Sequence, residues 1–228
     1  MGIPIVPTRY VTASDLDLWD QHLNAVRGNV SGQSDVSLHS DDSASSYGAV
    51  NEIVIKPTIS AGSWLTGRFM IDDPAARALA VEIIESGRDV MLQPAIRSVG
   101  SWGELAVMWF NGKISHTFRK GPMLELGGDL IDGTYLEKVE LHTPSSAASE
   151  VVHTAHNGIL QLARDRGWLK PQQQLLYQRL DVVELDNGSW ALLEAELFEP
   201  AFFFPVTANP AATADTFARA VLSLVEPT

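Results

Sequence analysis

Cysteine is absent from the 228-residue sequence, which excludes a disulfide framework and any metal site built on thiolates. Long apolar runs are absent too, and none approaches the ~18 residues that a membrane-spanning helix needs. The first residues, MGIPIVPTRYV, lack the charged and apolar regions of a secretory signal. These absences predict a soluble, cytoplasmic protein.

Positive charge is scarce, because 16 Lys and Arg residues against 28 Asp and Glu residues leave a net charge of −12. This balance disfavours nucleic acid or an anionic membrane as the main partner, but it allows a local basic pocket for phosphate. The two common phosphate-binding patterns, the Walker A loop and GxGxxG, are also missing.

Helices and strands are mixed along the chain, and two hairpins carry the strong Asn-Gly turn signal. The Ser-, Gly- and Asp-rich residues 28–49 are typical of a mobile loop. Together these patterns predict the α+β class. The predicted helices are 14–27 (with Ser14 as N-cap), 74–86, 147–166 and 211–225, the single strands are 51–57, 68–71 and 89–96, and the hairpins are 104–120 and 178–197.

Carboxylates gather in the second hairpin, which contains the run WALLEAELFEP. If Asn187-Gly188 is a two-residue turn, counting outward places Asp181 opposite Glu194. The same count places Arg179 opposite Glu196. All four side chains then lie on one face of the hairpin, with opposed Cβ atoms ~5 Å apart.

Like charges at that distance are unfavourable unless a cation lies between them. A set of carboxylates without Cys favours a hard ion, Mg²⁺ or Mn²⁺. The alternative is a solvent-facing strand side on which Arg179 neutralises one carboxylate. The apolar neighbours Leu192, Leu193 and Phe198 argue against a fully solvated face.

Lys56 is the first candidate for binding phosphate, because it closes the buried run IVIK and precedes the small-residue loop TISAGS. A solvated lysine is the more common outcome for such a position. Lys120 is a second candidate cation, with a solvated lysine as the equal alternative. Arg68 either lines a phosphate or substrate site or is a solvated edge-strand residue.

Counting from Asn111-Gly112 in the first hairpin pairs Glu104 with Arg119, either as ligand contacts or as a surface ion pair. The same count places His116 on the face of Leu105 and Phe118, where packing is favoured over catalysis. His153 and His156 are three residues apart on a predicted helix. Without a further ligand at metal-site spacing, they are interpreted as surface histidines.

Taken in order, these segments resemble the ATP-grasp superfamily. The matching pieces are PIVPT, IVIKPTISAGSWLTGRF, VMLQPAI, WGELAVMWFNGKISHTFRKGP and QRLDVVELDNGSWALLEAELFEP, which together span most of residues 3–204. Within the superfamily, KPTISAGS and ISHTFRKGP are similar to the bacterial group that contains O-ureido-serine cyclo-ligase. Glutathione synthetase and the RimK-like ligases are more distant relatives.

The resemblance implies two α+β lobes with ATP between them, a small lobe at residues 1–97 and a large lobe at 98–228. It implies that Lys56 binds the ATP phosphates and that Arg179 steadies the transferred phosphoryl group. Many family members have Asn where this chain has Glu196, which adds a negative charge to the second metal position. The remaining implied roles are a lid (Ser60, Ala61, Gly62, Ser63), an adenine-contacting hinge (Gln93, Pro94, Ala95, Ile96) and ligands for two Mg²⁺ ions (Asp181, Glu194, Glu196).

The implied activity is ADP-forming ligation of a small carboxylate, such as an amino acid, to an amine or another nucleophile through an acyl phosphate. Family members usually begin with a further α/β domain, whereas this sequence begins close to the PIVPT segment. This departure leaves a MgATP-binding module without turnover as the alternative function. It also leaves an apolar docking surface that favours a homo-oligomer.

Overall fold

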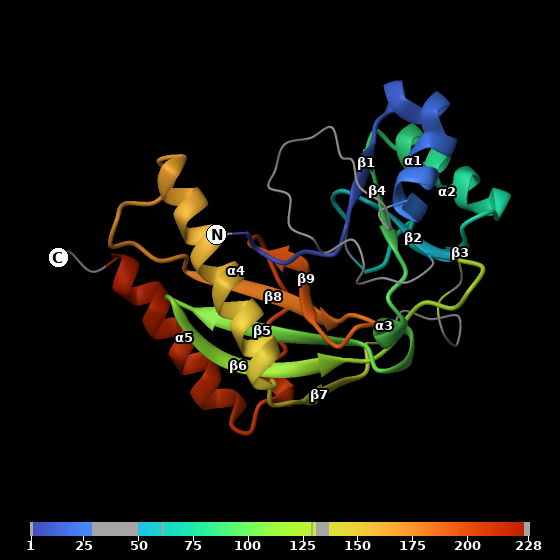
Figure 1. Ribbon diagram of the computed structural model, residues 1–228. Coiled ribbons are helices and arrows are strands. Elements are labelled where there is room, and N and C mark those ends of the chain that lie inside the picture. Colours follow the sequence, from blue (N-terminus) through green and yellow to red (C-terminus); the bar gives the residue numbers. More distant parts are fainter. Residues whose placement is uncertain (1, 29–49, 61, 129, 131–136, 226–228) are drawn as a thin grey trace.

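The computed structural model describes residues 2–28, 50–60, 62–128, 130 and 137–225. They form two antiparallel sheets, each with its own helices, which lie side by side with a cleft between them (Figure 1). This mixture confirms the predicted α+β class. Among the described residues, no helix is long and apolar enough to cross a bilayer. The predicted lobe boundary after residue 97 stays a prediction.

The first sheet has four strands in the order β1-β4-β2-β3. Side chains alternate along β2, so that Ile53 and Ile55 are fully buried while Val54 and Lys56 face the cleft. Asp73 caps α2 by accepting a hydrogen bond from the Ala75 N–H (2.9 Å). The elements of this half are β1 (Arg9–Val11), a 3-10 helix (Ala13–Leu18), α1 (Trp19–Gly28), β2 (Glu52–Pro57), β3 (Gly67–Met70), α2 (Pro74–Glu85) and β4 (Val90–Pro94).

The second sheet has five strands in the order β7-β6-β5-β8-β9, with α4 on one face and α5 on the other (Figure 1). Leu105 and Val107 pack in the core under α4, whereas Ala106, Met108 and Phe110 pack in the core with α5. This alternation divides the two faces of β5 between two helices. The elements are α3 (Arg97–Ser101), β5 (Glu104–Phe110), β6 (Lys113–Lys120), β7 (Val139–Leu141), α4 (Ser146–Asp165), β8 (Tyr177–Glu184), β9 (Trp190–Glu196), a 3-10 helix (Phe204–Val206) and α5 (Pro210–Val225).

The residues before β1 lie along the edge of the second sheet. The Val6 N–H donates to the Leu192 carbonyl (2.9 Å), and the Leu192 N–H donates to the Pro4 carbonyl (2.8 Å). These hydrogen bonds extend β9 with a short parallel neighbour at Ile5. The chain therefore starts against one sheet and then enters the other.

Several sequence predictions are wrong in detail. The predicted helix 14–27 is a 3-10 helix followed by α1, and the N-cap of the 3-10 helix is Thr12 rather than Ser14, with the Asp15 carboxylate accepting from both the hydroxyl and the N–H of Thr12. The first hairpin has the predicted Asn111-Gly112 turn, but a bulge between Met108 and Trp109 shifts the register beyond it. Four short elements (β1, α3, β7 and the 3-10 helix Phe204–Val206) were not predicted, and residues 29–49 of the predicted mobile loop lie outside the described residues.

The bulge changes two predictions at once. Glu104 pairs with Lys120, not with Arg119. His116 pairs with Met108 and so lies on the α5 side, although it is a packed histidine as predicted. Its Nε2–H donates to the Phe202 carbonyl (2.7 Å) within a cluster of phenylalanines.

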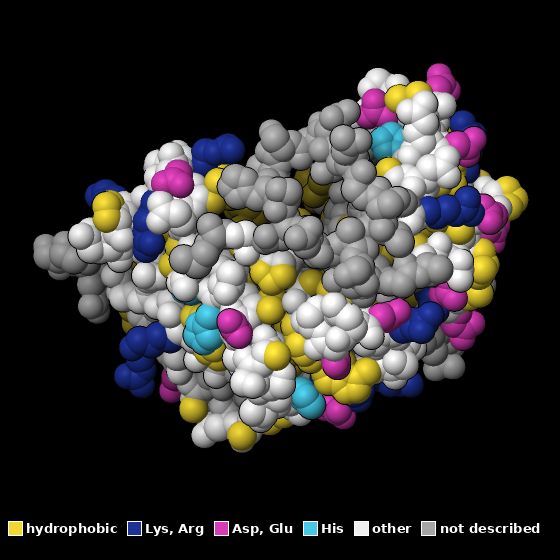
Figure 2. Space-filling view, in the orientation of Figure 1, with side chains coloured by type: hydrophobic (Ala, Val, Ile, Leu, Met, Phe, Trp, Pro, Cys, Tyr) yellow, Lys and Arg dark blue, Asp and Glu magenta, His cyan; other side chains and the backbone are white. Residues whose placement is uncertain are grey.

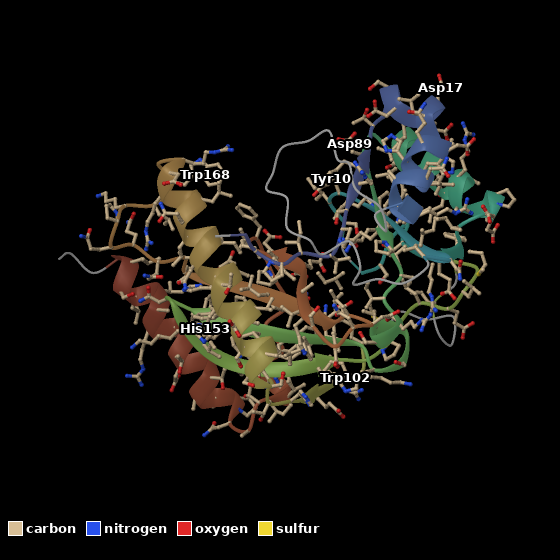
Figure 3. All side chains as sticks on the ribbon, in the orientation of Figure 1. Tyr10, Asp17, Asp89, Trp102, His153 and Trp168 are labelled. Carbon is tan, nitrogen blue, oxygen red and sulfur yellow. The ribbon has the colours of Figure 1, made fainter. Side chains whose placement is uncertain are left out.

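His156 is buried, which corrects the surface interpretation, whereas His153 on the same helix is exposed (Figure 3). The His156 ring stacks on Trp109 with 4.0 Å between ring centroids, and its Nδ1 contacts the Gln178 amide. Burial lowers the pKa of both His116 and His156, and each has one opposing hydrogen bond.

Acidification should destabilise the fold through these two histidines. Because their pKa values are depressed in the folded chain, the unfolded chain binds protons more readily below ~6.5, so stability falls as pH drops through that range. His116→Gln and His156→Gln should each reduce the change in urea midpoint between about pH 7.5 and about pH 5. His153→Gln is the matched control and should alter this change less, because the exposed His153 acts only through its charge beside His156; equal pH dependence in all four proteins would contradict the assignment.

Candidate active site in the cleft between the sheets

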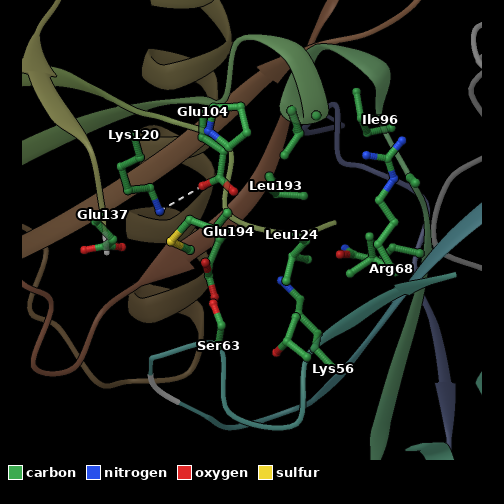
Figure 4. A pocket seen from close by; sticks show the side chains of 18 of the residues that line it. Lys56, Ser63, Arg68, Ile96, Glu104, Lys120, Leu124, Glu137, Leu193 and Glu194 are labelled. Atoms are coloured by element: carbon green, nitrogen blue, oxygen red, sulfur yellow. Dashed lines mark ion pairs between the residues drawn. The ribbon is translucent and has the colours of Figure 1, made fainter. Parts of the chain in front are cut away.

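The cleft is lined from both sheets. Lys56 and Arg68 come from the first sheet, and Lys120, Arg179 and the glutamates of β9 come from the second (Figure 4). Most of the predicted site residues therefore line one space, although they are up to about 140 residues apart in the chain. On the face drawn in Figure 2, acidic and basic side chains of the described residues are interspersed, so charge of one sign is not gathered there.

The second hairpin holds the carboxylates in the predicted register, but by a different route. Its turn is one residue longer than predicted, because Leu185 pairs with Ser189 and Glu184 with Trp190. A bulge between Asp181 and Val182 in the pairing then restores the count. The two deviations cancel, and the predicted pairs Asp181–Glu194 and Arg179–Glu196 are confirmed.

Three carboxylates converge at this point. Asp181, Glu194 and Glu196 each offer an oxygen, and these oxygens lie within 4.8 Å of one another. Asp181 is fully buried and Glu196 is half-buried. A compact set of hard oxygen donors fits Mg²⁺ or Mn²⁺. The arrangement fits the predicted metal ligands, whose role stays a prediction.

Two cations neutralise this acidic cluster. The Lys120 ammonium donates to Oδ2 of Asp181 (2.6 Å), and the Arg179 Nε–H donates to Oδ1 of Asp181 (3.0 Å). Arg179 also forms an ion pair with Glu196. The Lys120–Glu104 contact, at 2.8 Å, is an ion pair without hydrogen-bond geometry. Lys120 is thus buried, which excludes the solvated alternative.

The pKa values follow from burial and these charges. Burial alone would lower the pKa of Lys120 and Arg179, but neighbouring carboxylates, Asp181 above all, raise both above their ordinary values. Burial would raise the pKa of Asp181, yet Lys120 and Arg179 hold it below its usual range. Burial raises the pKa of Glu196 to about 7; Arg179 opposes this shift, and Asp181 and Glu194 add to it. A bound cation would favour the ionised form of Glu196.

Ser63, in the small-residue loop after β2, lines the cleft on the same side as Lys56 (Figure 4). Gly62, Ser63 and Leu65 all have positive φ angles (64°, 55° and 50°). Two of these three are not glycine, so the loop holds backbone conformations that side chains rarely adopt. Ser60, Gly62 and Ser63 line the cleft, and Ala61 lies outside the described residues.

The predicted hinge runs along the far end of the cleft, where Gln93, Pro94, Ala95 and Ile96 all contribute to the lining. The Gln93 side-chain amide is already engaged within the protein, because its Nε2 donates to Oγ1 of Thr8 (2.8 Å). Arg68 lies at this end beside Ile96 and donates from Nε to Glu52 (2.7 Å). Arg68 and Lys120 are therefore at opposite ends of the cleft (Figure 4).

Sequence reasoning missed one wall of the cleft. Residues 121–124 follow Lys120, and Pro122, Met123 and Leu124 line the cleft together with Glu137. Two hydrogen bonds fasten this segment to the first sheet, since the Gly127 and Gly128 N–H groups both donate to the Arg68 carbonyl (2.8 and 3.1 Å). The pairing of β7 with β6 brings Glu137 to the cleft, and the sequence did not reveal it because β7 is only three residues long.

The comparison with known proteins gives the same fold. The chain is 27% identical to the cycloserine biosynthesis protein DcsG of Streptomyces lavendulae, over 99% of this chain and 66% of that protein. The crystal structure of D-cycloserine synthetase DcsG superposes with a TM-score of 0.78 at 22% identity, over 99% and 66% of the two chains. The chain has the ATP-grasp fold.

More distant ATP-grasp structures agree. D-alanine–D-alanine ligase from Bacillus anthracis matches with a TM-score of 0.58 and 13% identity, over 98% of this chain and 64% of that one. The ATP-grasp ligase PsnB matches with a TM-score of 0.50 and 12% identity, over 96% and 56% of the chains. The chain thus spans less than two thirds of the length of these relatives. No protein-family model matches the chain.

Removal of the Lys120 charge should destabilise the ATP-grasp chain strongly. Lys120→Met leaves the buried Asp181 with one cation fewer and Glu104 with none of its described partners, and breaking a buried pair in this way costs about 3–5 kcal/mol. Urea unfolding in metal-free buffer measures the loss. Lys138→Met removes an exposed lysine and should change stability by less than about 0.5 kcal/mol; a similar value for Lys120→Met would show that the pair is not buried in solution.

Proposed function

We propose that the chain binds MgATP in the cleft and activates a small carboxylate for ligation to a nucleophile, with release of ADP. One observation carries this proposal: cations from both sheets line the same cleft as Glu194 and Glu196, and the buried Asp181 completes their carboxylate cluster. Phosphates need cations and backbone donors, and the ion that accompanies them needs oxygen ligands. The ATP-grasp fold of DcsG and D-alanine–D-alanine ligase supports the proposal.

The nucleotide would lie along the cleft with its base at the hinge, Pro94 to Ile96, and its phosphates toward Lys56. Lys56 has no ion-pair partner among the described residues, so its ammonium is free to contact a phosphate. The loop residues Ser60, Gly62 and Ser63 line the cleft as well and would offer backbone N–H groups. Asp181, Glu194 and Glu196 would hold Mg²⁺, which supplies charge neutralisation between the phosphates.

The reaction is then a two-step group transfer. A carboxylate oxygen of the acid attacks the γ-phosphorus of ATP, the bond to the β–γ bridging oxygen breaks, and ADP leaves. The lone pair of an amine next attacks the acyl carbon, inorganic phosphate leaves, and the amine loses a proton. Arg179 and Lys120 would stabilise the transferred negative charge, so positioning and electrostatics carry the catalysis. Among the described residues of the cleft no Ser–His–Asp arrangement competes with this scheme.

Turnover should appear when the chain is given ATP, Mg²⁺, hydroxylamine and a panel of amino acids and other small carboxylic acids. Hydroxylamine traps an acyl phosphate as a hydroxamate, so ADP and hydroxamate should form in equal amounts with at least one acid. ATP hydrolysis without hydroxamate would argue against the acyl phosphate. Nucleotide binding without ADP release for any acid would leave a MgATP-binding module.

MgATP should also stabilise the fold. At about 100 times the dissociation constant, one site contributes ~2.7 kcal/mol, which raises the melting temperature by roughly 5–10 °C for a chain of this size. Glu194→Gln should abolish most of this rise, because it removes a charged oxygen donor from the centre of the cluster. Glu150→Gln changes an exposed glutamate on α4 and should retain the full rise. A parent protein whose melting temperature does not change on addition of MgATP would contradict the proposed nucleotide site.

A further inference from the structure

Among the described residues, two glutamates that line the cleft have no ion pair, Glu137 and Glu194, and Glu194 belongs to the carboxylate cluster, so Glu137 is the one without an assigned role. The lining contains four cations, and three of them already have carboxylate partners: Arg68 with Glu52, Lys120 with Glu104 and Asp181, and Arg179 with Asp181 and Glu196. Lys56 is the fourth and lies on the phosphate side of the cleft. Among the residues that the structure describes, Glu137 has neither an ion pair nor a side-chain hydrogen bond, although it is half-buried and lines the cleft.

The strand register aims Glu137 at the reacting end of the cleft. Lys120 pairs with Val139, and the ladder continues by one step because the Gly121 N–H donates to the Lys138 carbonyl (2.8 Å). The next position places Glu137 opposite Pro122, on the same face as Lys120. Figure 4 agrees, since Glu137 lies beside Lys120 and Glu194, away from Arg68 and Ile96.

Two of the expected ligands do not suit Glu137. ATP phosphates are anionic and would be repelled by a second unpaired carboxylate. Among the described residues, the group with metal-ligand geometry is Asp181, Glu194 and Glu196, and Glu137 is outside it. The neighbouring Pro122, Met123 and Leu124 are apolar, so a cation there would be shielded from water and would interact with the carboxylate more strongly.

We propose that Glu137 binds the protonated amino group of the acid substrate and thereby selects an amino acid over acids without an amine. This inference rests on the proposed function, since it places the substrate carboxylate near the metal ligands and its ammonium at Glu137. A zwitterionic substrate would then be neutralised at both ends, by cations at its carboxylate and by Glu137 at its amine. Glu137 is in this sense a specificity-determining residue for ligation.

The test compares three acids that differ only at the α-position. The best amino acid from the panel is assayed beside its α-hydroxy analogue and its analogue with hydrogen at that carbon, with ADP release as the readout. The parent protein should favour the amino acid in kcat/KM. Glu137→Gln should lower kcat/KM for the amino acid by about 10- to 100-fold, as expected for the loss of a charged hydrogen bond. Its KM for ATP and its rates with the other two acids should stay within about threefold.

Glu140→Gln is the matched control, because it changes the next glutamate along the chain, which lies on β7, is exposed and pairs with Arg119 outside the cleft. It should keep the parent preference. Equal losses for all three acids in Glu137→Gln would show a structural role and overturn the inference, as would an unchanged preference. A parent protein without preference for the amino acid would overturn it while leaving ligation in place. ADP release with no acid would remove the proposed function, and this inference with it.

Discussion

The buried carboxylate of Asp181 is the constraint on which the candidate site depends. A buried charge must be paired, and the Asp181 carboxylate accepts hydrogen bonds from Lys120 on β6 and from Arg179 on its own strand. These contacts fix the end of β6 relative to the middle of β8, and Arg179 also forms an ion pair with Glu196 on β9. Strands β6, β8 and β9 thereby present one charged surface to the cleft, although β5 lies between β6 and β8. The same ion pairs that stabilise the sheet also set the positions of the groups that a phosphate would meet.

The two sheets divide the chemical work along the cleft. The first sheet contributes Lys56, which has no ion-pair partner in the part of the chain that the structure describes, and the small-residue loop after it. The second sheet contributes the carboxylates, already partly neutralised by their own cations. The segment after Lys120 reaches back to the Arg68 carbonyl on β3 and closes one side. A ligand that touches Lys120 and Leu124 is therefore in contact with the element that links the two sheets.

The sequence predicted the long elements and the carboxylate pairs, because both arise from local patterns. Asn-Gly turns, alternation in β2 and the caps of α2 all act within a few residues. Bulges are harder to predict from sequence, since no residue type marks their position. In the first hairpin a bulge places Lys120 opposite Glu104. In the second hairpin a bulge compensates for a turn that is one residue longer than predicted, so the predicted carboxylate pairs are unchanged. The wall around Met123 and Glu137 depends on the three-residue β7, which is too short to leave a period in the sequence.

The residues before β1 bear on how the halves of the molecule can move. The chain passes from one sheet to the other at Val6–Thr8 and again at Pro94–Ile96, and the Gln93–Thr8 hydrogen bond joins the two passages. Val6 and Ile96 belong to one apolar cluster. These two passages are adjacent and together define an axis. Rotation of one sheet relative to the other about this axis strains neither passage. Sliding of one sheet past the other would stretch both. The Gly127 and Gly128 hydrogen bonds to the Arg68 carbonyl are a third link between the halves, so opening at the end where Lys120 and Glu194 lie must either break these bonds or carry residues 121–128 along with the first sheet.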